Sequence, residues 1–175
     1  MHWNAILSHG AGYGLVMSLL FTAALLAGFA VSKDFLLGDY PPAIQERYGR
    51  PRSARGRKVA VWVGALFWGA VFLPLLTVAL LDLRASLGGG DLGFWQAAAC
   101  AATAFATMSL YDLVVLDWLV IAGLRPSLMV LPGTEGMKEY RDLRFHAVEA
   151  LKGSPLILVV GLVAGGLTML TEAIN

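Results

Sequence analysis

Four long apolar segments decide which folds are open to this sequence. They cover residues 12–32, 59–81, 94–123 and 155–171. A helix rises about 1.5 Å per residue, so about 20 residues cross a hydrocarbon core of about 30 Å. Charged residues make up only 14% of the chain, against about a quarter in soluble domains. The segments also lack the alternation of barrel strands, so the sequence predicts an all-α integral membrane protein with four transmembrane helices.

The four segments are expected to pack as a bundle in one domain, residues 1–175. No basic residue precedes the first segment, and no small-residue cleavage site separates it from Lys33 and Asp34. We therefore expect this segment to be retained as a helix. The single cysteine, Cys100, excludes an intrachain disulfide and any CxxC motif.

Basic residues are concentrated in the two long loops, 33–58 and 124–154. Outside these loops only Arg84 is basic, between the second and third segments. The loop residues are Lys33, Arg47, Arg50, Arg52, Arg55, Arg57, Lys58, Arg125, Lys138, Arg141, Arg144 and Lys152. Because loops rich in Lys and Arg stay in the cytoplasm, the sequence predicts two cytoplasmic loops and both termini outside, in the cell's inner (plasma) membrane.

Each loop is predicted to contain a short amphipathic or interfacial helix. In the first loop, Pro41 and Pro42 suit a first helical turn and Gly49 would end the helix. In the second loop, Gly133 interrupts regular structure, and a helix is expected to begin near Thr134 and run toward the fourth segment.

Two features inside the segments concern helix packing. Pro74 lies within the second segment and is expected to kink it. Gly161 and Gly165 form a GxxxG spacing in the fourth segment, which lets another helix approach closely. This spacing fits either packing inside the bundle or a homo-oligomer formed through the same face.

Two aspartates interrupt the third apolar segment. Asp117 stands beside Trp118, which suits the membrane interface, whereas Asp112 lies deeper. An aspartate inside the membrane costs up to about 3 kcal/mol, so Asp112 should face the bundle interior. The two are five residues apart, or about 140° around an α-helix, and share a face only if the helix is distorted.

A second polar cluster precedes the fourth segment. On a helix starting near Thr134, the side chains of Glu139, Asp142, His146 and Glu149 fall within an arc of about 80°. The stripe can be interpreted as a solvated face, as an acid/base group in which Asp142 tunes His146, or as a metal site. The repeated Glu-x-x-His pattern of di-iron bundles is absent.

The candidate site combines these acids with nearby cations and hydroxyls. The candidate catalytic residues are Asp112, Asp117, His146, Asp142 and Glu149. Headgroup binding is assigned to Arg47, Arg52, Arg141, Arg144, Tyr111 and Tyr140, because arginine is a bidentate donor for phosphate or carboxylate. No cofactor is predicted and no metal ligands are assigned, although a divalent metal stays open, and no P-loop, GxSxG, HExxH or GxGxxG motif occurs.

Three functions fit this pattern. The first is a membrane enzyme doing acid/base chemistry, such as isomerisation or cyclisation, on an isoprenoid or other lipid-like substrate at the cytoplasmic leaflet. The second is a proton-coupled transporter or channel, and the third is a non-catalytic accessory subunit. The expected partners are membrane lipids and a lipid-like small molecule. Nucleic acid is not expected at a net charge of +1.

Overall fold

Four long helices dominate the computed structural model, which describes residues 3–174. Each is long and apolar enough to cross a membrane, and this described part of the chain contains no strand. The prediction of an all-helical chain with four candidate spans is therefore confirmed. The spans are Trp3–Val31, Ala54–Ser86, Phe94–Leu124 and Leu143–Ile174.

Three of these spans consist of more than one helical segment. Helix α1 is Trp3–Val31, and the other segments are α3 Ala54–Ala65, η2 Leu66–Phe72, α4 Leu73–Ser86, α5 Phe94–Tyr111, η3 Asp112–Leu124, α6 Leu143–Gly153 and α7 Pro155–Ile174. Segments η2 and η3 are π-helices, in which i→i+5 hydrogen bonds replace the i→i+4 ladder. Pro74 follows η2 closely and has no N–H to donate. A π-helical stretch thus directly precedes the turn that contains Pro74, where the sequence predicts a kink.

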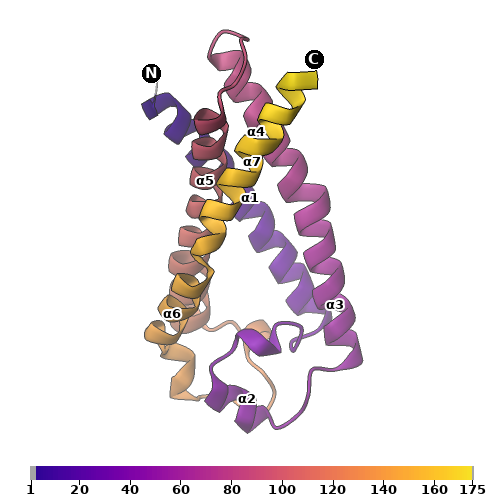
Figure 1. The fold of residues 1–175 in the computed structure, drawn as a ribbon. Coiled ribbons are helices and arrows are strands. Elements are labelled where there is room, and N and C mark those ends of the chain that lie inside the picture. Colours follow the sequence, from indigo (N-terminus) through magenta and orange to yellow (C-terminus); the bar gives the residue numbers. More distant parts are fainter. Residues whose placement is uncertain (1–2, 175) are drawn as a thin grey trace.

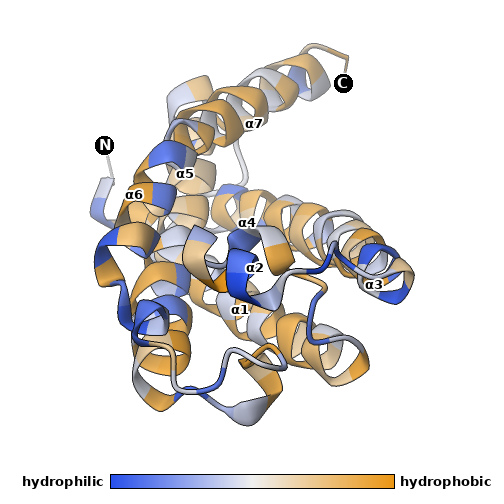
Figure 2. Ribbon diagram, turned by 90° about the horizontal axis from the view of Figure 1, so that it is seen from below, coloured by the Kyte–Doolittle hydropathy of each residue, from blue (hydrophilic) through white to orange (hydrophobic). Residues whose placement is uncertain are grey.

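The short helices of both loops lie at one end of the molecule, opposite both termini (Figure 1). We call these the loop end and the termini end. The short helices are η1 Leu37–Asp39, α2 Pro42–Tyr48, η4 Ser127–Met129 and η5 Lys138–Arg141. Helix α2 has Pro42 in its first turn and ends at Gly49, whose φ of 64° is left-handed. Viewed toward the loop end, Figure 2 shows hydrophilic segments in the loops and largely hydrophobic long helices.

Helix α5 lies against both α1 and α7, where backbones approach closely. A Cβ added at Gly10 or Gly14 of α1 would lie 2.5 Å from a carbonyl oxygen of α5. Cβ atoms at Gly161 and Gly165 of α7 would each lie 2.9 Å from an α5 carbonyl oxygen. The glycines therefore permit these contacts, and the Gly161/Gly165 face packs against α5.

Helix α1 begins at Trp3, well before the expected start at residue 12. Besides the close approach of Gly10 to α5, His9 anchors this first part of the helix, since its Nε2 lies 3.1 Å from the carbonyl oxygen of Ala79. The early turns are thus held by tertiary contacts that hydropathy alone does not reveal.

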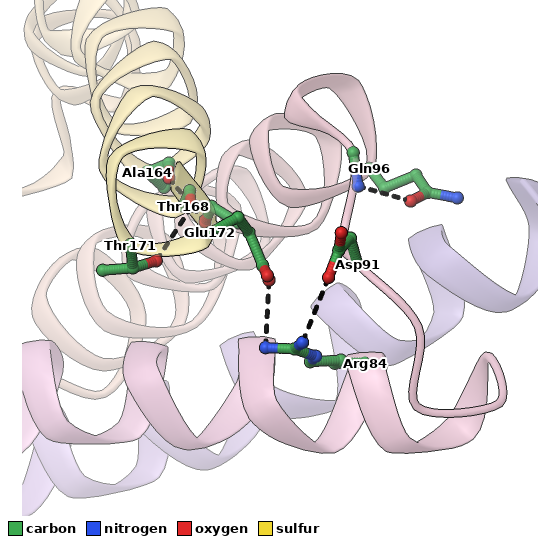
Figure 3. A network of polar contacts seen from close by, with 8 residues as sticks. Arg84, Asp91, Gln96, Ala164, Thr168, Thr171 and Glu172 are labelled. Carbon is green, nitrogen blue, oxygen red and sulfur yellow. Dashed lines mark hydrogen bonds and ion pairs between the residues drawn. The ribbon is translucent and has the colours of Figure 1, made fainter. Parts of the chain in front are cut away.

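At the termini end, Arg84 joins α4 to two other parts of the chain (Figure 3). Its guanidinium lies 3.0 Å from Glu172 of α7 and 3.3 Å from Asp91, which precedes α5. The side chain of Glu172 is only 13% exposed. The structure thus places Glu172 in an ion pair between helices rather than in open solvent.

At the loop end, the two loops pack on each other through buried tyrosines. The hydroxyl of Tyr40 donates to the carbonyl oxygen of Met129 at 2.7 Å. The hydroxyl of Tyr140 accepts from the backbone N–H of Leu131 at 3.0 Å and lies 2.7 Å from Thr134 Oγ1. The loops therefore form one ordered layer under the helices.

Asp34 fixes the first loop where α1 ends and α3 begins. Its buried carboxylate accepts from Ser32 Oγ at 2.6 Å, and from the backbone N–H and Oγ of Ser53 at 2.6 and 3.0 Å. Burial acts to raise the pKa of Asp34, but the hydrogen bonds from Ser32 and Ser53 outweigh it and leave the pKa below its ordinary value. The ionised carboxylate thus ties α1 to the N-cap of α3.

Candidate functional site

The π-helix η3 changes the relation between the two aspartates of the third span. Residues five apart are far around an α-helix, but i→i+5 bonding brings them about one turn apart. Asp112 and Asp117, the first and sixth residues of η3, therefore lie toward the same side, and their carboxylates interact electrostatically. The distortion required for a shared face is present.

His146 of α6 stands beside Asp117. Its Nδ1 lies 3.3 Å from Asp117 Oδ1, and the side chains of His146 and Asp117 are 6% and 22% exposed. Helix α6 packs directly against η3, so the contact joins the third and fourth spans. A carboxylate in this position favours a proton on Nδ1 and holds the imidazole in one orientation.

The other ring nitrogen, His146 Nε2, is buried and has no hydrogen-bond partner among residues 3–174. Buried polar atoms nearly always have a partner. With Nδ1 facing Asp117, Nε2 is the ring nitrogen that no side chain or backbone group of the described residues contacts by a hydrogen bond.

Asp112 is half-buried, and its carboxylate makes no ion pair or side-chain hydrogen bond within the described chain. Asp117, Asp39 and His146 all act on it electrostatically. The arginine partner that a structural aspartate at this depth would require is therefore not found in the described residues.

Asp39, in η1 of the first loop, belongs to the same electrostatic group and was not predicted. Its side chain is exposed. Desolvation by the surrounding chain still raises its pKa; Arg52 opposes this rise, while Asp117 and Glu149 add to it. No helical spacing relates Asp39 to the third span, so only the folded loop brings it near. We define the acid cluster as Asp39, Asp112, Asp117 and His146.

Arg52 and Glu149 lie at the edge of the acid cluster. Both act electrostatically on Asp39. Glu149 is exposed and pairs with Lys152 at 2.6 Å, so its carboxylate is partly neutralised. Arg52 is the nearby cation among the predicted headgroup residues.

Asp142 lies at the N-terminus of α6, because the helix containing His146 begins later than expected. Gly133 and Gly136 adopt left-handed φ values of 83° and 80°, and α6 starts only at Leu143. The Asp142 side chain accepts from the backbone N–H of Phe145 at 2.9 Å and acts as the N-cap. The carboxylate beside His146 comes from Asp117 instead.

The other predicted headgroup residues are not gathered at the acid cluster. Tyr140 is buried and its hydroxyl is occupied within the second loop. Tyr111 is half-buried and contacts Thr22 of α1 at 3.5 Å. Arg47 donates to the carbonyl oxygen of Gly133 at 3.3 Å. Two further predicted residues are exposed and make no ion pair within the described residues, namely Arg141 and Arg144.

A second histidine–aspartate pair lies at the termini end. His9 Nε2 is 3.4 Å from Asp82 Oδ2, and the hydroxyl of Tyr13 donates to the same oxygen at 3.1 Å. The pair links α1 to α4, far along the bundle from the acid cluster (Figure 1). His2, the other histidine near this terminus, lies outside the described residues.

Comparison with known proteins identifies no relative: no family model, no curated protein and no solved structure matches this chain. Within residues 3–174, no group of three or more His, Cys, Asp or Glu side chains is arranged to hold a metal ion. The site is therefore interpreted from its own geometry.

Proposed function

We propose that this protein is a membrane enzyme that transfers protons to and from a lipid-like substrate, as in isomerisation or cyclisation. One observation carries the proposal: Nδ1 of His146 is held by Asp117, while its buried Nε2 has no partner among the described residues. An oriented imidazole with one free nitrogen is suited to general acid/base catalysis.

The residues of the acid cluster have different roles in this proposal. Asp117 orients His146, and Nε2 of His146 removes or donates the proton. Asp112, on the same side of η3 and without an ion pair in the described chain, is the second proton carrier. Isomerisation adds a proton at one carbon and removes one at another, so it needs no redox partner. In this proposal Arg52, which acts electrostatically on Asp39, binds an anionic substrate head.

A lipid-like substrate is favoured by the surroundings of the acid cluster. The aspartates and the histidine come from two apolar spans, and η3 also carries exposed apolar side chains such as Val114, Trp118 and Leu119. In a bilayer this surface contacts acyl chains, so an amphiphile can approach laterally. Its polar head would meet the hydrophilic loop end.

We further propose that the loop end faces the cytoplasm and that both termini are outside. The support is the concentration of twelve of the thirteen basic residues in the two loops. Alkaline phosphatase fused after Asn175 should be active in this orientation, and a fluorescent protein fused there should be dark. The opposite pattern would reverse the orientation and the leaflet from which the substrate enters.

Binding can be tested by identifying co-purified lipids with mass spectrometry. Wild type, His146→Gln and Asp112→Asn are compared with Glu46→Gln, a control at an exposed position of α2. We expect wild type and Glu46→Gln to retain one lipid-like species that both site variants lose or retain in altered amount. An identical lipid complement in four folded proteins would contradict a substrate site at the acid cluster.

Proton-coupled transport is a second candidate, favoured by the pair of His9 and Asp82 at the termini end. Ionisable pairs at both ends of a bundle are expected of a proton path. Proteoliposomes containing a trapped pH dye distinguish the two functions. A transporter would acidify the lumen under an imposed gradient, whereas the proposed enzyme would not.

A further inference from the structure

A groove between α1 and α3 is apolar along its walls and charged at one end, which matches the tails and headgroup of a phospholipid. It encloses about 500 Å³. Ala27 and Val31 line it from α1, Trp62 lines it from α3, and Leu66 lines it from the start of η2. Arg55 and Lys58 line its end in the first turns of α3. The groove is thus apolar along most of its length and positively charged at one end.

The two cations of the groove are not neutralised by the protein. Neither Arg55 nor Lys58 makes an ion pair or a side-chain hydrogen bond within residues 3–174. The stretch from Gly49 to Lys58 contains no acidic residue. The nearby carboxylate of Asp34 is already bound by Ser32 and Ser53. An anionic group is therefore the complementary ligand at this position.

The apolar walls explain why the ligand should be a lipid. Trp62, Leu66 and Val31 are 65%, 58% and 55% exposed, which suits contact with acyl chains in a bilayer. Trp62 stands one helical turn beyond Lys58, at the junction of charged and apolar lining, where an indole ring matches the boundary between headgroup and hydrocarbon. Basic pockets between spans recognise anionic headgroups in this way.

We infer that the groove between α1 and α3 binds one anionic phospholipid, with its phosphate at Arg55 and Lys58 and an acyl chain along Trp62 and Leu66. This site is separate from the acid cluster, and its ligand is a structural lipid rather than the proposed substrate. Occupancy would fill the groove between two helices and anchor the loop end in the anionic leaflet.

Native mass spectrometry of the full chain in detergent, titrated with phosphatidylglycerol or phosphatidylcholine, tests this inference. Wild type should prefer phosphatidylglycerol. The double variant Arg55→Gln/Lys58→Gln should bind it on the order of tenfold more weakly or worse. The control Arg50→Gln/Lys138→Gln removes one arginine and one lysine from exposed positions that do not line the groove, and should bind as wild type does.

Ala27→Leu provides an independent variant that keeps both cations. Ala27 is exposed in the groove, so a larger side chain there should obstruct the acyl chain and weaken binding without disturbing the core. Equal losses of phosphatidylglycerol binding in the two charge variants would mean that binding depends on surface charge in general and not on this groove. That result, unimpaired binding by Ala27→Leu, or the absence of a phosphatidylglycerol preference in wild type would each overturn the inference.

Discussion

The contact between Asp117 and His146 determines which ring nitrogen is free. With Nδ1 lying 3.3 Å from the carboxylate, neutral His146 should carry its proton on Nδ1. Asp117→Asn should increase the tautomer protonated on Nε2, because an amide does not stabilise the Nδ1 proton as a carboxylate does.

Nitrogen NMR of histidine-labelled protein measures these tautomers. His146→Gln identifies the signal among the three histidines of the chain. A wild-type His146 already protonated on Nε2 would contradict the assigned orientation, and so would an unchanged tautomer in Asp117→Asn.

The hydrogen bonds to Asp34 predict a loss of stability in acid. Because the pKa of Asp34 is lower in the folded state than its ordinary value of about 3.9, its contribution is present above that value. It is lost as the pH falls through the folded-state pKa. Asp34→Asn should lower the free energy of unfolding by about 1.5–3 kcal/mol at neutral pH, and the gap to wild type should narrow in acid.

Thermal unfolding in detergent at several pH values checks the Asp34 prediction. Glu46→Gln serves as the control, because Glu46 is exposed on α2. A gap between wild type and Asp34→Asn that does not change with pH would show that ionisation of Asp34 is not the source of the stability.

Individual site residues were predictable where their chemistry conflicts with their surroundings. Asp112 and Asp117 stand out as acids within an apolar span. Asp39 does not, since an acid in a hydrophilic loop is ordinary and only tertiary packing relates it to the other acids. The contacts of the Tyr140 hydroxyl with Leu131 and Thr134 were not predictable either, because they depend on the fold of the second loop.

Among the helical elements, η3 alters the site most. At α-helical spacing, Asp112 and Asp117 point in different directions around the helix. No residue pattern predicts the π-helical geometry that brings them to the same side. Glycine turns in the second loop likewise delay α6 and turn Asp142 into a cap. The apolar lengths of the spans were predictable from composition, whereas their local geometry depends on neighbouring helices.

The packing of α1 on α5 can be tested with a matched pair of glycines. A Cβ at Gly14 would lie 2.5 Å from the Ala104 carbonyl oxygen and 2.8 Å from Thr107 Cβ, but a Cβ at Gly12 would meet nothing within 4 Å. Gly14→Ala should lower the free energy of unfolding by about 1–3 kcal/mol. Gly12→Ala should be neutral or stabilise the helix by up to about 1 kcal/mol.

Unfolding in mixed micelles of mild detergent and dodecyl sulfate measures both glycine variants. Equal stability of Gly14→Ala and Gly12→Ala would mean that α1 and α5 are not in close backbone contact.

The molecule as a whole has two different ends. At the termini end, Arg84 links α4 to Glu172 of α7 and to Asp91 in the loop before α5 (Figure 3). At the loop end, the packed loops carry Asp39 toward the acids of η3 and the histidine of α6. The class of fold was predictable because it follows directly from the number and length of the apolar segments. The site was not, because it depends on how two loops and two spans meet.

Proton transfer to a lipid-like substrate at the acid cluster is the central claim, and solvent deuterium tests it most directly. Membranes containing the protein are incubated with total host lipid extract in heavy water, and the lipids are analysed by mass spectrometry. Wild type and Glu46→Gln should introduce carbon-bound deuterium into one lipid class, and His146→Gln and Asp112→Asn should not. Absence of incorporation by wild type, or equal incorporation by all four proteins, would contradict the proposed enzyme.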